Sequence, residues 1–171
     1  MSRNCLIVDL DRCIGCHACE VACKNENGVA LGEYWNRVIQ VGPHGTFPDL
    51  EQYWLPVQCQ QCENAPCVKV CPTGASHRNE DGVVVVDQDR CIGCKYCYQA
   101  CPFGVPHYTS AGMDKCDLCL EAGVALGEAP NCVQACKFRA LHFGTIDELV
   151  AGSGGRAKKI EASTGPSYVL L

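Results

Sequence analysis

The chain has 171 residues, a formal net charge of −5 and seventeen cysteines. Only disulfide scaffolds and metal proteins commonly reach such a cysteine content, and disulfide scaffolds are usually short secreted domains. The negative charge argues against a nucleic-acid partner. Residues 1–11 hold no long apolar region, and no apolar run approaches the length of a membrane span. We therefore expect neither a secretory signal nor direct membrane insertion.

Residues 4–8 (Asn-Cys-Leu-Ile-Val) predict a short strand. Cys5 lies in this strand, outside any cysteine motif, and is more typical of a small buried side chain than of a metal ligand. The first motif follows as Cys13-Ile-Gly-Cys16-His-Ala-Cys19-Glu-Val-Ala-Cys23. Because C-x2-C pairs alone also suit structural zinc, zinc and disulfides stay as alternatives to iron at this point.

Residues 24–54 form an insert that is rich in aromatic residues and in turn-forming residues around 42–48. Two interpretations of the aromatic side chains stay open. They could form a small core that covers the metal sites, which we favour because so cysteine-rich a chain has few other large apolar residues. They could instead form a docking patch. The aromatic residues are Tyr34, Trp35, Phe47, Tyr53 and Trp54.

The second and third motifs flank an apolar segment at residues 82–87. They read Cys59-Gln-Gln-Cys62-Glu-Asn-Ala-Pro-Cys67-Val-Lys-Val-Cys71-Pro72 and Cys91-Ile-Gly-Cys94-Lys-Tyr-Cys97-Tyr-Gln-Ala-Cys101-Pro102. The third motif is the iron–sulfur run C-x2-C-x2-C-x3-C-P, in which three cysteines hold one [4Fe–4S] cluster and the fourth holds the neighbouring cluster. With its two motifs and the strand between them, this stretch resembles a two-cluster bacterial ferredoxin.

The last part of the chain holds the fourth motif. Residues 102–115 predict a loop with room for one strand, and the motif follows as Cys116-Asp-Leu-Cys119 with Cys132-Val-Gln-Ala-Cys136. Residues 140–146 predict a strand that returns beside residues 4–8, and residues 147–150 predict a helical turn. Residues 151–171 predict a linker and a C-terminal tail. The tail is either frayed or a docking arm, and we favour the arm because its last four residues are apolar.

An internal repeat relates the motifs. Asp9–Cys16 and Asp87–Cys94 are identical at seven of eight positions, at an offset of 78 residues. We therefore expect an α+β fold of two bacterial-ferredoxin-like modules, related by a pseudo-two-fold repeat, with short strands and helices around four iron–sulfur clusters. The domain would span residues 1–150, with an outer module of 1–23 plus 116–146 and an inner module of 55–110.

The four motifs hold sixteen of the seventeen cysteines, which is the number that four cubane clusters need. Because the second and third motifs form the ferredoxin-like unit, the first and fourth motifs must pair with each other. Both of these end in Cys-Lys, whereas the middle pair both end in Cys-Pro. The predicted ligand sets are Cys13, Cys16, Cys19 and Cys136 for cluster 1; Cys23, Cys116, Cys119 and Cys132 for cluster 2; Cys71, Cys91, Cys94 and Cys97 for cluster 3; and Cys59, Cys62, Cys67 and Cys101 for cluster 4.

The sequence points to electron transfer and away from catalysis. It contains no nucleophile–base pair, phosphate loop or flavin fingerprint. All sixteen motif positions are cysteine, so we expect no iron with an open position, and we assign no histidine as a ligand. Lys24, Lys95, Lys137 and Arg139 lie beside the ligands. Positive charge there would stabilise the reduced cluster and raise its potential, unless these side chains are simply solvated.

Over residues 4–150 the chain resembles the four-cluster subunit of the dimethyl sulfoxide, polysulfide and nitrate reductase group. The matching stretches are Cys71-Pro-Thr-Gly-Ala75, Asp81-Gly-Val-Val-Val-Val-Asp87, Cys91-Ile-Gly-Cys94 and Phe143-Gly-Thr-Ile-Asp147. The resemblance implies a molybdenum- or tungsten-pterin catalytic subunit beside the clusters of the first and fourth motifs, and a second, flavin- or quinone-linked redox subunit beyond the middle pair. The nitrate reductase type replaces one cysteine of the third motif with tryptophan, whereas this chain keeps Cys94.

The chain is short for this group and shows no export signal, so we expect a cytoplasmic complex; export with a signal-bearing partner is the alternative. Similar short subunits serve tungsten aldehyde oxidoreductases that also carry a flavin subunit. A second hypothesis is the four-cluster subunit of a hydrogenase or formate dehydrogenase complex, and a third is a structural metal protein without redox activity. Clusters near both ends of a rod could also let copies join head to tail into filaments.

Overall fold

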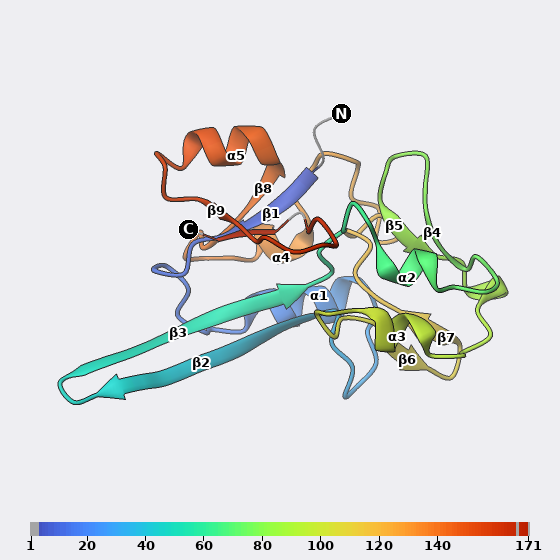
Figure 1. Cartoon of the computed structure of the whole chain (residues 1–171), viewed down its shortest axis with the longest axis horizontal. Helices are drawn as coiled ribbons and strands as arrows, with labels where there is room; N and C mark the ends of the chain where they lie inside the picture. Colours follow the sequence, from blue (N-terminus) through green and yellow to red (C-terminus); the bar gives the residue numbers. More distant parts are fainter. Residues whose placement is uncertain (1–3, 167, 171) are drawn as a thin grey trace.

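The computed structural model describes residues 4–166 and 168–170, and it is a mixed helix-and-strand fold, as predicted (Figure 1). The helices are α1 (Ala18–Glu26), α2 (Pro66–Lys69), η1 (Gln88–Arg90, a 3₁₀ helix), α3 (Tyr96–Ala100), α4 (Asn131–Gln134) and α5 (Ile146–Gly152). The strands are β1 (Asn4–Val8), β2 (Asn36–Thr46), β3 (Asp49–Gln58), β4 (Ser76–Arg78), β5 (Val84–Val86), β6 (His107–Thr109), β7 (Gly112–Asp114), β8 (Leu141–Thr145), β9 (Lys158–Lys159) and β10 (Tyr168–Leu170).

The largest sheet has the strand order β8-β1-β10-β9. Strand β1 is at the centre because its apolar side chains are buried on both faces, and Val8 is fully buried. Strand β8 runs antiparallel to β1, with Leu6 opposite Phe143, so the predicted return strand is confirmed. Cys5 is 2% exposed and packs with Ile7, which confirms the prediction that it is buried.

The C-terminal segment folds back over the chain in the part that the structure describes. Strand β10 pairs with β1 in parallel. The Arg156 guanidinium lies 3.2 Å from a carboxylate oxygen of the buried Asp9. The backbone N–H of Glu63 donates a hydrogen bond of 2.8 Å to the Gly165 carbonyl. The tail that the sequence predicts as a docking arm thus contacts the main sheet and the second motif, and its role toward a partner stays a prediction.

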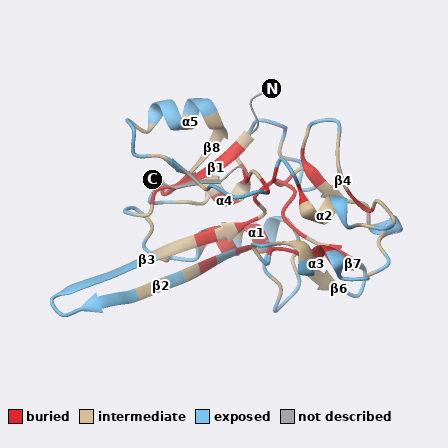
Figure 2. Cartoon of the chain, viewed as in Figure 1, coloured by how far each residue is buried: buried red, intermediate tan, exposed pale blue. Residues whose placement is uncertain are grey.

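The insert at residues 24–54 contributes most of a long hairpin of β2 and β3, which projects from the rest of the chain (Figure 1). At its base, Trp35 and Val38 are buried in the main core cluster. Toward its tip the hairpin is exposed (Figure 2). Phe47, between the two strands, is 89% exposed. The base of the hairpin therefore fits the core interpretation of the insert, whereas docking through the exposed tip stays a prediction.

Short helices and hairpins surround the cysteine motifs. Helix α1 packs on α4, and α2 packs on α3. Two hairpins, β4–β5 and β6–β7, flank the third motif in sequence. The prediction of a single strand in residues 102–115 is wrong, because this segment forms both strands of the β6–β7 hairpin. Among residues 4–166 and 168–170, no helix combines the length and apolar character needed to cross a bilayer.

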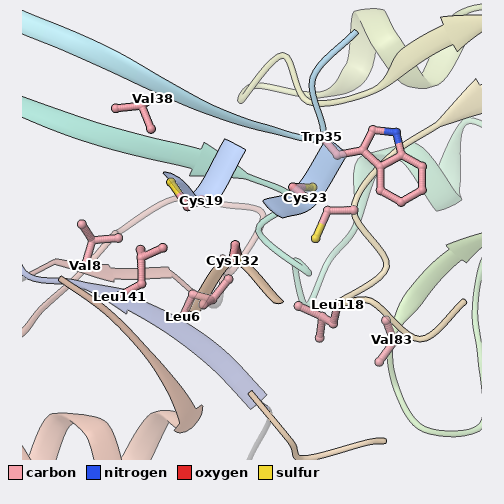
Figure 3. Packing of buried hydrophobic residues seen from close by; sticks show 11 residues of the cluster. Leu6, Val8, Cys19, Cys23, Trp35, Val38, Val83, Leu118, Cys132 and Leu141 are labelled. Carbon is pink, nitrogen blue, oxygen red and sulfur yellow. The ribbon is translucent and has the colours of Figure 1, made fainter. Parts of the chain in front are cut away.

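The main core is built partly from motif cysteines. Cys19, Cys23 and Cys132 lie among buried leucine and valine side chains, including Leu6 and Leu118 (Figure 3). Because so many of its residues are cysteines, this core contains few other apolar side chains. Groups that bind these cysteines would therefore also hold the fold together.

Candidate metal centres

The sixteen motif cysteines gather in four groups of four, which we name sites A to D. Site A is Cys13, Cys16, Cys19 and Cys136, which line one hollow. Site B is Cys23, Cys116, Cys119 and Cys132, which interact electrostatically with one another. Site C is Cys59, Cys62, Cys67 and Cys101, around a second hollow. Site D is Cys71, Cys91, Cys94 and Cys97, around a third hollow. The structure brings together the cysteines of each predicted set; that each set ligates one cluster stays a prediction.

Left-handed residues shape the two Cys-Ile-Gly-Cys loops. In the first motif, Gly15 has a φ of 68° and His17 a φ of 59°. In the third motif, Gly93 has a φ of 66° and Lys95 a φ of 64°. Such residues curl the chain tightly, so that three cysteines close in sequence face one hollow. The same backbone path at both places explains why the sequence repeats there.

Backbone N–H groups point at several of the sulfurs. Ala140 N donates to Cys136 Sγ at 3.3 Å, Ser76 N donates to Cys71 Sγ at 3.5 Å, and Met113 N donates to Cys91 Sγ at 3.3 Å. Donors at a sulfur stabilise its thiolate form and spread the negative charge of a ligated site. Sites A and D thus carry built-in partners for anionic sulfur.

Burial works against a bare thiolate at the inner positions. It raises the pKa of the Cys19 thiol and of the Cys23 thiol to about 12. It also raises the pKa of Cys116 and of Cys132. A thiolate at these positions therefore needs positive charge beside it, and iron supplies that charge. Four sulfurs around one hollow are the donor set of a [4Fe–4S] cluster, so the residues fit this cofactor.

Buried polar side chains support the same fit. Ser76 Oγ, Thr164 Oγ1 and the Asn36 amide are buried and have no hydrogen-bond partner of normal geometry among the described residues. Ser76 lies near the Cys67 thiol, Thr164 near the Cys62 thiol and Asn36 near the Cys19 thiol. Burial raises the pKa of each thiol, and the nearby polar side chain lowers it by a smaller amount. Sulfurs that carry negative charge when ligated would give these orphaned donors a partner.

Neighbouring sites lie close enough to affect one another. Burial raises the pKa of the Cys132 thiol of site B, and the nearby Cys19 of site A adds to this effect. Burial likewise raises the pKa of Cys116 of site B, and the nearby Cys59 of site C adds to it. Helices α2 and α3, which hold cysteines of sites C and D, pack on each other. Site B is therefore the neighbour of sites A and C, and site C is the neighbour of site D. The exposed cysteines Cys16 and Cys94 belong to sites A and D.

Two further residues at these sites were not found from the sequence. Lys115 is 3% exposed, lines the hollow of site C, and donates from Nζ to the Cys116 carbonyl at 3.2 Å and to the Val84 carbonyl. Lys115 is adjacent in sequence to Cys116, just as Lys24 is adjacent to Cys23, so the same sequence signal marks both lysines. The other residue is Tyr108, whose hydroxyl lies 2.9 Å from Cys97 Sγ. No motif marks Tyr108, because it is 11 residues away from that cysteine.

Known families and proteins match most of the chain. A family model described as a 4Fe-4S dicluster domain matches residues 50–146, and one described as a 4Fe-4S binding domain matches residues 6–25. The chain is 44% identical over 151 residues to the B subunit of the anaerobic dimethyl sulfoxide reductase of Escherichia coli (strain K12), covering 83% of this chain and 73% of that protein. It is 48% identical over 148 residues to the thiosulfate reductase electron transfer subunit PhsB of Salmonella typhi, covering 84% and 76% of the two chains. It is 43% identical to protein NrfC of Escherichia coli (strain K12), covering 84% of this chain and 66% of that protein.

Proposed function

Because the chain belongs to the 4Fe-4S dicluster domain family, we propose that it is the electron-transfer subunit of a multi-subunit oxidoreductase, with one [4Fe–4S] cluster at each of sites A to D. Such clusters accept and release single electrons. The chain itself would provide the ligands, hold the sites in a row and present the two end sites to other subunits. This role needs no catalytic residue in the chain.

The observation that carries the proposal is the grouping of the cysteines. Cys136 lies with the first motif although it is 117 residues beyond Cys19 in the sequence. Cys71 lies in the same way with the third motif. Such an exchange of one cysteine between motifs is typical of paired [4Fe–4S] sites, whereas a structural zinc site usually takes its four ligands from two adjacent pairs. This favours pairing of the first motif with the fourth and of the second with the third, as in the two ferredoxin-like modules that we propose.

The order A-B-C-D supports transfer from one end of the chain to the other. Site B is enclosed, since its four cysteines are buried, whereas site A reaches the surface at Cys16 and site D at Cys94. Exposed apolar side chains line both end sites: Ile14 at site A and Ile92 at site D. Two separate surfaces of this kind suit two different redox partners.

For the partners, we propose a molybdenum- or tungsten-pterin catalytic subunit at site A and a flavin- or quinone-linked subunit at site D. The relatives support a reductase complex, since they include a B subunit of dimethyl sulfoxide reductase and the thiosulfate reductase electron transfer subunit PhsB. A tungsten aldehyde oxidoreductase is a narrower member of the same class of partner.

Elemental analysis of the native complex tests this function. We expect about sixteen irons per chain, together with molybdenum or tungsten. Sixteen irons with nickel would move the chain to a hydrogenase complex and contradict the pterin partner. Zinc in place of iron, without visible absorption, would overturn electron transfer altogether.

A further inference from the structure

The β6–β7 hairpin covers site D. Met113 N on β7 donates to Cys91 Sγ at 3.3 Å. Gly112, with a φ of 135°, lies so close that a Cβ placed there would be 3.0 Å from the same sulfur. Gln88 fixes the hairpin further, because its side-chain amide donates to the Met113 carbonyl at 2.7 Å. The hairpin is therefore tied to the third motif at the level of its cysteine sulfurs.

A side chain of the same hairpin reaches a second cysteine of site D. Tyr108 on β6 is directly opposite Met113 in the strand register. Its hydroxyl lies 2.9 Å from Cys97 Sγ. One cross-strand pair thus supplies a backbone contact to Cys91 and a side-chain contact to Cys97.

The Tyr108 ring is held in place by two residues of the third motif. The Tyr98 ring meets it edge to face, with 6.4 Å between the ring centroids. The Lys95 ammonium lies over its face, 5.6 Å from the centroid. Contacts of both kinds are favourable and depend on ring position, so the hydroxyl is directed at the sulfur by packing and not only by its own hydrogen bond.

The direction of the hydrogen bond follows from ligation. In a free thiol either atom could donate. A cysteine that ligates iron is a thiolate without a proton, so the phenol must be the donor and the sulfur the acceptor. We propose that Tyr108 sets the reduction potential of the cluster at site D through this hydrogen bond. The inference rests on the proposed function, because it requires a cluster on these four cysteines.

The sign of the effect is fixed by charge. Reduction adds one negative charge to the ligated site, and a donor at a ligand sulfur stabilises the more negative state. Loss of the hydroxyl therefore lowers the potential. Hydrogen bonds to charged groups are among the strong ones, so we expect the equilibrium constant for reduction at site D to fall about tenfold, which is about 59 mV for one electron.

The test compares Tyr108→Phe with Tyr98→Phe in the full chain, purified anaerobically with its clusters. Each variant loses one phenol oxygen within the same aromatic pair, but the hydrogen bond to Cys97 Sγ comes from Tyr108. The reduction potentials are measured by redox titration with detection by electron paramagnetic resonance, and the iron content of each sample is determined. We expect one potential to fall in Tyr108→Phe, and all potentials in Tyr98→Phe to match those of the unmodified chain.

Unchanged potentials in Tyr108→Phe at full iron content would overturn the inference, as would an equal shift in Tyr98→Phe. If Tyr108→Phe loses iron, the unmodified sequence is produced with 3-fluorotyrosine, whose more acidic phenol is a stronger donor. One potential should then rise, and its failure to rise refutes the inference. An unmodified chain without [4Fe–4S] signals would instead refute the proposed function, so the two failures are distinguishable.

Discussion

Sites A and D share one loop sequence, but different segments of the chain pack over the two loops. We call these segments the covers of the sites. Both loops contain Asp-Arg-Cys-Ile-Gly-Cys, and both continue with a left-handed residue, His17 at site A and Lys95 at site D. Both expose the second cysteine of the loop, Cys16 or Cys94. The shared sequence thus fixes a shared backbone path and the exposure of one ligand position.

The covers differ because each loop meets a different hairpin. At site A the indole of Trp54, from β3, lies against Gly15 and meets the His17 ring edge to face at 5.9 Å. The carboxylate of Glu20 binds His17 Nδ1 at 2.8 Å and also accepts from Val38 N on β2. At site D the cover is the short β6–β7 hairpin. The motif therefore determines the loop, while segments outside the motif determine what surrounds the sulfurs and hence how each site is tuned.

The largest expected effect is the loss of a whole cluster when one of its cysteine ligands is replaced, and it shows which cysteines belong to which site. Cys13→Ala and Cys136→Ala should each remove the same cluster, and so lose about four irons and the same paramagnetic signal, because both residues belong to site A. Cys23→Ala, in the same motif as Cys13, should remove a different signal, since Cys23 belongs to site B. Iron analysis with redox titration makes the comparison. If Cys13→Ala and Cys23→Ala instead lose the same signal, or if Cys136→Ala loses a signal of the middle pair, the proposed pairing is wrong.

A smaller effect, on thermal stability, should distinguish the cover of site A from that of site D. Gly15→Ala and Gly93→Ala place a side chain at nearly equal φ, 68° and 66°, and this strain costs about 1–2 kcal/mol in either loop. At Gly15 a Cβ would also lie 2.3 Å from the Trp54 ring, whereas at Gly93 nothing among the described residues lies within 4 Å. Overpacking of this kind costs roughly 1–3 kcal/mol more, which corresponds to about 2–4 °C in Tm for each kcal/mol in a chain of this size.

We therefore expect Gly15→Ala to lose its visible cluster absorption at a lower temperature than Gly93→Ala on anaerobic heating. The matched control is Gly15→Ala combined with Trp54→Leu, which should recover part of the difference because the smaller side chain leaves room for the added methyl group. Equal transition temperatures for the two single variants would show that Trp54 does not press on the loop.

Much of this architecture could be predicted because it depends on local signals. The β1 and β8 strands follow from short apolar runs, and the motif cysteines follow from spacing alone. Even Cys136, far along the chain, could be placed with the first motif because the second and third motifs account for each other's fourth cysteine. Counting ligands substitutes here for long-range structural information.

The sequence indicates that aromatic residues of the insert cover metal sites, but the particular contacts could not be predicted, because they join distant segments. The contact of Tyr108 with Cys97 requires a turn within residues 102–115, where the sequence alone predicts a loop with room for one strand. The contact of Trp54 with Gly15 requires the register of a long hairpin. The pairing of β10 with β1 joins a three-residue strand to the opposite end of the chain. The periodicity of apolar residues does not predict contacts between segments so far apart in the sequence.

The smallest expected effect concerns charge at equivalent loop positions. Lys95 is exposed and its ammonium lies beside site D, so Lys95→Gln should lower the potential of that cluster. Because solvent and salt screen an exposed charge, the equilibrium constant for reduction should change by less than about tenfold, and the shift should shrink at about 1 M salt. At site A, the equivalent residue is a histidine, whose ring, unlike an ammonium group, carries no permanent positive charge, and its Nδ1 lies 2.8 Å from the Glu20 carboxylate. His17→Gln should therefore move the site A potential less than Lys95→Gln moves that of site D.

The two variants are compared by redox titration at low and high salt. A shift in His17→Gln as large as that in Lys95→Gln, or one that salt leaves unchanged, would show that the difference between the two sites does not arise from the charge at this position.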